Sequence, residues 1–311
     1  MKSKTRLFAG CAIVATVYAF SASAKDFAPV NTDPPGFGFD SATTFDILGI
    51  KPGDTLDDAR NKIKSTMNKE TRDVKYSANV SNNKGAQVAI NFISEIKLKS
   101  DSGLNPMYDQ GKSVDKITVY VASSIYDNRV LGIRRRISFG PGQLISADAM
   151  RLQVEEKYGK PTSVKRGYSG SAEQLIYVYS NGKLLSQGDY APTMQSGVHG
   201  GNSPTTEYSE YSDTWVSDGR TITAKIPCAG FVFGGVNHLE YDFNDKIRIV
   251  DDKCSGMFRV NLNGPPAGLN DVNFELVDTK RTYGFRKAFD KAILDELSNN
   301  STRADTPKPK L

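Results

Sequence analysis

The chain has 311 residues, of which 38% are hydrophobic, 10% aromatic and 24% charged. This composition excludes an intrinsically disordered chain, and the length allows one large domain or two small ones, each with a proper core. The formal net charge of +5 is concentrated at the two ends of the chain. The body between residues 25 and 298 is formally neutral, which excludes a general basic surface for nucleic acid.

The first 24 residues have the pattern of a secretory signal peptide. Three cations among the first six residues precede an apolar run from Leu7 to Phe20, and Ala22-Ser23-Ala24 supplies the small residues of a cleavage site. We therefore expect a mature chain that starts at Lys25 and is periplasmic or secreted. The apolar run is shorter than the about 20 residues that span a bilayer, so no transmembrane segment is expected after cleavage.

An alternative is lipidation of Cys11, because Phe8-Ala9-Gly10-Cys11 faintly resembles a lipoprotein box. The apolar run lies mostly after Cys11 rather than before it, which favours the cleavable signal peptide. Removal of the signal peptide leaves two cysteines, Cys228 and Cys254, in an oxidising compartment. We expect them to form a disulfide, with two free thiols as the alternative.

The next segment, 25–43, is rich in Pro, Gly and Asp and predicts an irregular lead-in. A short apolar stretch at 45–50 and a turn then lead to Thr55, which with Asp58 forms the pattern of a helix-capping box. The helix that follows has an apolar stripe. Its members are Leu56, Ala59, Ile63 and Met67.

Alternating apolar residues from 74 to 139 predict antiparallel strands, with a hairpin turn at 82–85. After Gly140-Pro141-Gly142, Ser146 caps a second expected helix, which Gly159 closes. The repeated order of turn, cap, helix and strands indicates two related lobes, 44–139 and 140–298. Coincidence is the alternative, because this sequence of local signals is common.

The C-terminal half continues with strand patterns at 175–179, at 222–243 and at 247–262. Between them, 186–218 is poor in aliphatic residues and predicts a long surface loop. A final helix is expected from about Asp278 to Ser298, followed by a disordered tail at 299–311. These elements together predict an α+β fold in which a few helices pack on antiparallel sheets, with one disulfide.

The segment from Phe45 to Ala59, together with Lys157-Tyr158-Gly159-Lys160-Pro161-Thr162, resembles uncharacterised secreted proteins of Gram-negative bacteria. Its helix start is similar to that of the small outer-membrane lipoprotein A and beta-lactamase-inhibitor-like modules. This resemblance implies short helices packed on an antiparallel sheet and binding of proteins without chemistry. It covers about a fifth of the mature chain and assigns no functional residue.

The loop at 186–218 has the composition of a recognition surface. Aromatic side chains stand in a background of Gly, Ser and Asn, which is typical of loops that bind partners. An insertion without a partner is the alternative. The candidate contact residues are Tyr190, His199, Tyr208, Tyr211 and Trp215.

His238, Glu240 and Asp242 alternate along an expected strand and therefore share one face. An imidazole and two carboxylates can hold a divalent metal, but a solvated polar face is the simpler interpretation, so we expect no metal and no cofactor. In Arg134-Arg135-Arg136 the outer two arginines share one face, which suits a solvated face or a small anion site. No G-x-S-x-G nucleophile motif and no complete Gly-rich nucleotide loop occurs.

These observations predict a non-enzymatic periplasmic or secreted binding protein. Its partner is expected to be an envelope protein or a cell-wall component, and not nucleic acid; the oligomeric state is left open. Two alternatives are a periplasmic hydrolase with a dispersed site near His238 and a structural envelope protein.

Overall fold

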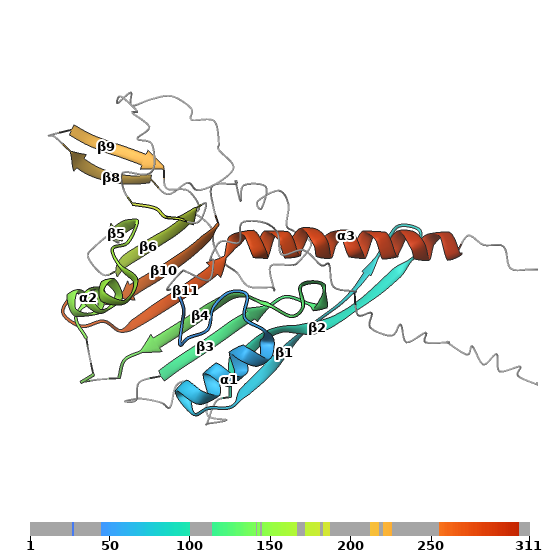
Figure 1. The fold of residues 1–311 in the computed structure, drawn as a ribbon, viewed down its shortest axis with the longest axis horizontal. Helices are drawn as coiled ribbons and strands as arrows, with labels where there is room; N and C mark the ends of the chain where they lie inside the picture. Colours follow the sequence, from blue (N-terminus) through green and yellow to red (C-terminus); the bar gives the residue numbers. More distant parts are fainter. Residues whose placement is uncertain are drawn as a thin grey trace, which may run out of the picture.

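The fold was analysed in a computed structural model, which describes residue 27 and residues 45–99, 114–140, 142–143, 145–166, 172–180, 183–186, 212–217, 220–225 and 255–304. Within these ranges the chain forms three α-helices and a predominantly antiparallel sheet (Figure 1). The α+β class predicted from the sequence is confirmed. The expected signal peptide, most of the lead-in, and Cys228 and Cys254 lie outside the described residues.

The first half of the fold is a helix followed by four strands. Helix α1 (Leu56–Met67) begins at the predicted cap, where the Thr55 side chain accepts a hydrogen bond from the Asp58 backbone and the Asp58 side chain accepts one from the Thr55 backbone. The strands are β1 (Thr71–Ser81), β2 (Gln87–Leu98), β3 (Val114–Val121) and β4 (Val130–Ser138). A short 3₁₀ turn, η2 (Ser124–Tyr126), connects β3 to β4.

The second half repeats this order with longer connections. Helix α2 (Ala147–Tyr158) starts at the predicted Ser146 cap and ends at Gly159, whose φ is +81°. It precedes β5 (Ser163–Arg166), β6 (Ala172–Ser180) and the short β7 (Lys183–Leu184). Two further sheet strands, β10 (Gly256–Asn263) and β11 (Asp271–Asp278), complete this half.

Several elements differ from the sequence-based expectation, and the short strands β5 and β7 are among those that were not predicted. The end of the expected loop at 186–218 contains β8 (Ser212–Ser217), which pairs with β9 (Arg220–Lys225) as a separate hairpin. Strand β11 was not predicted, although Val272, Phe274 and Leu276 alternate along it. Helix α3 (Thr279–Ala304) continues beyond the predicted end at Ser298 into the expected tail.

The two halves contribute to one continuous sheet. Its strand order is β1-β2-β3-β4-β11-β10-β6-β5, with β7 paired to β6. The last strand of each half, β4 and β11, pair antiparallel at the centre, with Gly132 opposite Val277 and Ser138 opposite Asp271. Apart from the separate β8–β9 hairpin, the described strands of the two halves therefore belong to one sheet, and the expected division into two lobes is not confirmed.

Each face of the sheet has its own apolar core. On one face, which we call the helix-covered face, α1 and α2 pack on the sheet, and their buried Ala59, Ile63, Met150 and Val154 belong to the same cluster as residues of β3, β4, β10 and β11. On the opposite face, α3 covers one end of the sheet. Its buried stripe is the predicted one: Phe285, Phe289, Ile293 and Leu297.

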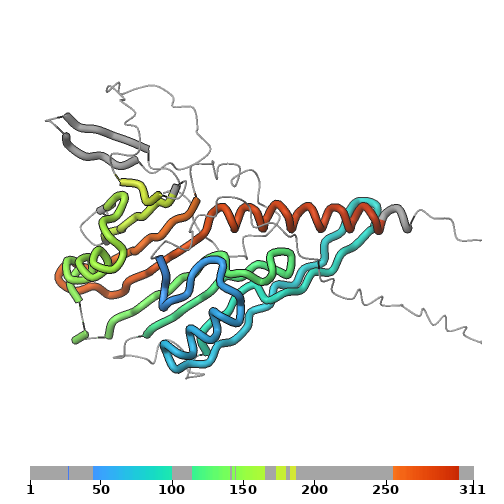
Figure 2. Tube along the Cα trace, viewed as in Figure 1, coloured from blue at the N-terminus to red at the C-terminus, as the bar shows by residue number. Residues whose placement is uncertain are grey.

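The β1–β2 hairpin projects beyond the sheet alongside α3, as Figure 2 shows in blue and red. Strand β2 pairs with β3 only from Glu95 to Lys97, so the rest of its inner edge has no neighbour among the described strands. Helix α3 holds this stretch instead, through Phe92 against Phe285 and Phe289 and through a bond from the Asn82 amide to the Leu297 carbonyl. We call Tyr76–Phe92 together with Phe285–Leu297 the hairpin–helix arm.

In the part of the chain that the structure describes, none of the helices combines the length and the apolar character needed to cross a membrane.

Candidate functional site

Most of the site residues predicted from the sequence lie outside the described residues. This applies to Tyr190, His199, Tyr208, Tyr211, His238, Glu240 and Asp242, and to the expected disulfide between Cys228 and Cys254. Trp215 is the exception, since it lies in β8 opposite Ile222 of β9. The aromatic loop and the polar strand around His238 therefore stay predictions.

The described residues contain a different candidate, on the sheet face that carries α3. Ile117, Leu276 and Val260 belong to the apolar core on the helix-covered face. Because successive side chains of a strand point to opposite faces, the residues next to them in each strand lie on the other face. There, the register aligns polar residues in rows across the central strands. One row runs Thr118, Arg134, Glu275, Arg259, the next Lys116, Arg136, Asn273, Asn261, Gln174, and the third Ser138, Asp271, Asn263.

We call these three rows, with Glu95 and Lys97 of β2, the polar sheet face. Its side chains are joined by ion pairs and hydrogen bonds that cross the strands. Arg134 lies 3.5 Å from Glu275, and Arg136 lies 3.1 Å from Asp271. The Asp271 carboxylate also accepts hydrogen bonds from Asn263 and Asn273. This network holds the side chains of the face in fixed positions relative to one another.

Arg134 and Arg136 are accessible parts of this network, whereas Arg259 is buried. The Arg134 and Arg136 side chains are 40% and 53% exposed, whereas Glu275 and Asp271 are 8% and 13% exposed. Lys116 is also exposed, and Arg134 stacks over the Tyr120 ring at 5.9 Å. An incoming partner would therefore meet guanidinium and ammonium groups first, with the acids beneath them.

Arg135 points to the other face, as the strand alternation predicts for the middle arginine of the run. Its Nε and Nη2 atoms bond the Asp115 carboxylate in a two-pronged ion pair. Arg135 also lines a pocket of about 490 Å³ on the helix-covered face. The remaining lining residues come from α1, α2, β11 and the turn before α1: Asp46, Ile47, Leu48, Gly49, Thr66, Met150, Gln153, Val154, Lys157, Tyr158 and Phe274.

Three polar groups meet at this pocket. The Lys157 ammonium lies 3.1 Å from the Asp46 carboxylate and 4.8 Å from the centre of the Tyr158 ring. Burial opposes the positive charge, but the hydrogen bonds to Tyr158 and Asp46 outweigh it and raise the pKa of Lys157. Burial also raises the pKa of the Tyr158 hydroxyl, against the opposing charges of Lys157 and Arg135. Lys157 therefore stays cationic and Tyr158 neutral near pH 7.

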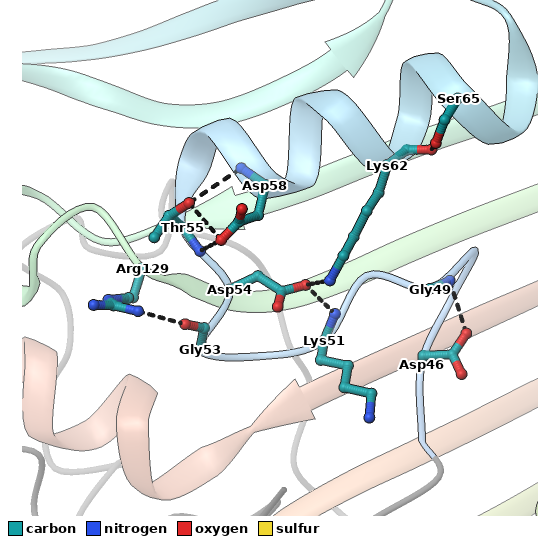
Figure 3. Close-up of polar contacts among 10 residues, drawn as sticks. All are labelled: Asp46, Gly49, Lys51, Gly53, Asp54, Thr55, Asp58, Lys62, Ser65 and Arg129. Atoms are coloured by element: carbon teal, nitrogen blue, oxygen red, sulfur yellow. Dashed lines mark hydrogen bonds and ion pairs between the residues drawn. The ribbon is translucent and has the colours of Figure 1, made fainter.

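The turn that carries Asp46 and Leu48 is braced by its own polar groups, which Figure 3 draws. The Gly49 N–H donates to Asp46 Oδ1 at 2.8 Å, and Ile47 and Ile50 exchange two backbone hydrogen bonds. Further along, Asp54 accepts from the Lys51 backbone and from the Lys62 ammonium. Both central residues of the turn, Leu48 and Gly49, have positive φ, +57° and +75°.

Among the described residues no group of three or more His, Cys, Asp and Glu side chains is placed to hold a metal ion. Both histidines and both mature cysteines lie outside those residues. Comparison of the chain with known protein families, with curated proteins and with solved structures finds no match.

Proposed function

We propose that this chain is a non-enzymatic binding protein, exported by a cleavable signal peptide, that holds an envelope protein partner on the polar sheet face. The observation that supports this is the set of three cross-strand rows of charged and amide side chains beside α3. Antiparallel sheets whose purpose is only structural also have a polar face, but here Glu275 and Asp271 are covered and Arg134 and Arg136 are exposed above them.

The charge of the face favours a partner with acidic groups. Its cations are Lys97, Lys116, Arg134, Arg136 and Arg259, and its acids are Glu95, Asp271 and Glu275. Arginines bind carboxylates in a planar, two-pronged geometry, which gives orientation as well as attraction.

The topology supports a further proposal about the origin of this surface. A helix followed by four antiparallel strands occurs twice, as α1 with β1–β4 and as α2 with β5, β6, β10 and β11. We infer an internal duplication whose two halves joined along β4 and β11. The polar sheet face then lies across the junction of the two halves, and both contribute residues to it.

The test is a pull-down from envelope extract with the double variant Arg134→Glu/Arg136→Glu. Lys84→Glu is the matched control, because Lys84 is an exposed cation in the β1–β2 turn, away from the face. The proposal requires a partner that the unmodified protein and the control retain and the double variant loses. Equal retention by all three proteins rejects the polar sheet face as the binding surface.

The aromatic loop predicted at 186–218 is a second possible contact surface. Deletion of 187–211 leaves β8 and β9 intact, so it separates the loop from the hairpin that follows it. Loss of the same partner on this deletion, with the polar sheet face unchanged, would assign the contact to the loop.

A further inference from the structure

The pocket on the helix-covered face lies on the side of the sheet opposite to the polar sheet face. Its volume of about 490 Å³ is within the range of pockets that hold small molecules. Its walls come from segments far apart in the sequence, which meet only because β4 and β11 pair at the centre of the sheet. The pocket is therefore a product of the joined halves rather than of either half alone.

One wall of the pocket is apolar. Met150 and Val154 of α2 are 8% and 3% exposed, and Leu48 and Phe274 are partly buried against the same core. Such a wall accepts an aliphatic or aromatic body, since burial of apolar surface is favourable and carries no directional requirement.

The position of Leu48 is unusual for its side chain. Its φ of +57° lies in the left-handed region, which Asn, Asp and Gly tolerate and leucine rarely adopts. In a tight turn with two positive φ values, a polar residue would be the ordinary choice. Leucine at this strained position places an apolar side chain at the pocket, and strain of this kind is concentrated at binding sites.

The opposite part of the pocket presents two cations. Asp115 accepts hydrogen bonds from the Nε and Nη2 atoms of Arg135, and among the described residues none accepts from its Nη1. Lys157 is held by Asp46, and Arg135, Lys157 and Tyr158 all line this one pocket. Asp46 and Asp115 balance these two charges. An added carboxylate would gain hydrogen bonds from Arg135 and Lys157 and would be repelled by Asp46.

We propose that this pocket binds a small amphipathic carboxylic acid, with its carboxylate between Arg135 and Lys157 and its apolar body against Leu48, Met150, Val154 and Phe274. A long-chain quaternary amine lacks the acceptor oxygens that the two cations require, and a short acid lacks the body that the apolar wall requires. The ligand class follows from the combination of these two walls.

The experiment is calorimetric titration of the purified protein with decanoate, and with decanol and butyrate as probes that lack one of the two features. Decanoate is expected to bind at least tenfold more tightly than either. Lys157→Gln should weaken decanoate binding at least fivefold, whereas Lys160→Gln, an exposed cation beyond the end of the same helix, should leave it unchanged. Gln153→Trp fills the exposed rim of the pocket and should abolish binding without removing a core contact.

Equal affinity for decanoate and decanol would overturn the role of the two cations. No decanoate binding at millimolar concentration, with a normal melting curve, would overturn the proposal as a whole. Binding that Gln153→Trp leaves intact would place the acid elsewhere and overturn the site. Because the polar sheet face is untouched in each variant, partner capture by that face succeeds or fails independently of these results.

Discussion

Phe285 provides a direct test of the hairpin–helix arm. Its side chain is fully buried, and its ring contacts Phe92, Tyr126 and Phe289 at centroid distances of 6.3, 5.9 and 5.4 Å. Truncation of a buried phenylalanine to alanine costs about 3–5 kcal/mol, because transfer energy is lost and a cavity remains. Phe285→Ala should therefore lower the free energy of unfolding by about 4 kcal/mol, a large share of the about 5–15 kcal/mol of an ordinary domain.

The loss should be largest in the arm. Beyond its short pairing with β3, strand β2 depends on α3 for its packing, so loosening α3 exposes the hairpin amides before the central strands. Hydrogen exchange followed by mass spectrometry should show faster exchange in 76–92 by about a thousandfold if the whole 4 kcal/mol appears as local opening. Exchange in β10 and β11 should change less.

The matched control is Leu294→Ala on the same helix, because Leu294 is 63% exposed. Its urea unfolding curve should shift by no more than about 0.5 kcal/mol. Equal destabilisation by the two substitutions, or uniform exchange across the whole sheet in Phe285→Ala, would refute the reasoning that α3 holds the hairpin through its buried stripe.

Three further predictions concern the turns, the cap and the cysteines. Gly264→Ala should lower the free energy of unfolding by about 2–4 kcal/mol in a thermal melt, because φ is +125° and the new Cβ would lie 2.6 Å from the Asn270 nitrogen. Gly85→Ala is its control: φ is +80° but the space around it is open, so the loss should be only about 1 kcal/mol. Thr55→Ala should cost about 1 kcal/mol through loss of the α1 cap. The hydrogen bonds from Thr55 lower the pKa of Asp58. The ionised Asp58 carboxylate therefore stabilises the fold above the ordinary carboxyl range near pH 4, and this stabilisation is lost as the pH falls through the lowered pKa. Asp58→Asn should flatten the acid side of the plot of unfolding free energy against pH, and an unchanged acid side would contradict this. Alkylation of the denatured mature protein should modify Cys228 and Cys254 only after reduction, and the disulfide should contribute about 3.5 kcal/mol; two thiols alkylated without reductant would contradict the pairing.

Local signals in the sequence predicted the elements whose physics is local. Thr55 and Ser146 each specify a helix start by capping it. The residues at 82–85 specify a turn, and the helical periodicity of Phe285 and Phe289 specifies a buried stripe. Each of these signals acts through contacts between near neighbours in the sequence. For the same reason the α+β class followed from the sequence. The missed strand β11 has the ordinary alternation at Val272, Phe274 and Leu276, so a more complete reading of the pattern could have found it.

The candidate sites could not be predicted in this way. Alternation along β4 separates Arg134 and Arg136 from Arg135, but it does not identify their partners. Glu275 and Asp271 lie more than a hundred residues away and become neighbours only when β11 pairs with β4. The same pairing brings α2 and the turn at Leu48 over one central pocket. The caps, the turns and the apolar stripes are determined by the sequence alone, because they depend on residues a few positions apart. The polar sheet face and the pocket were decided only by the tertiary structure, because long-range strand pairing sets which charges meet.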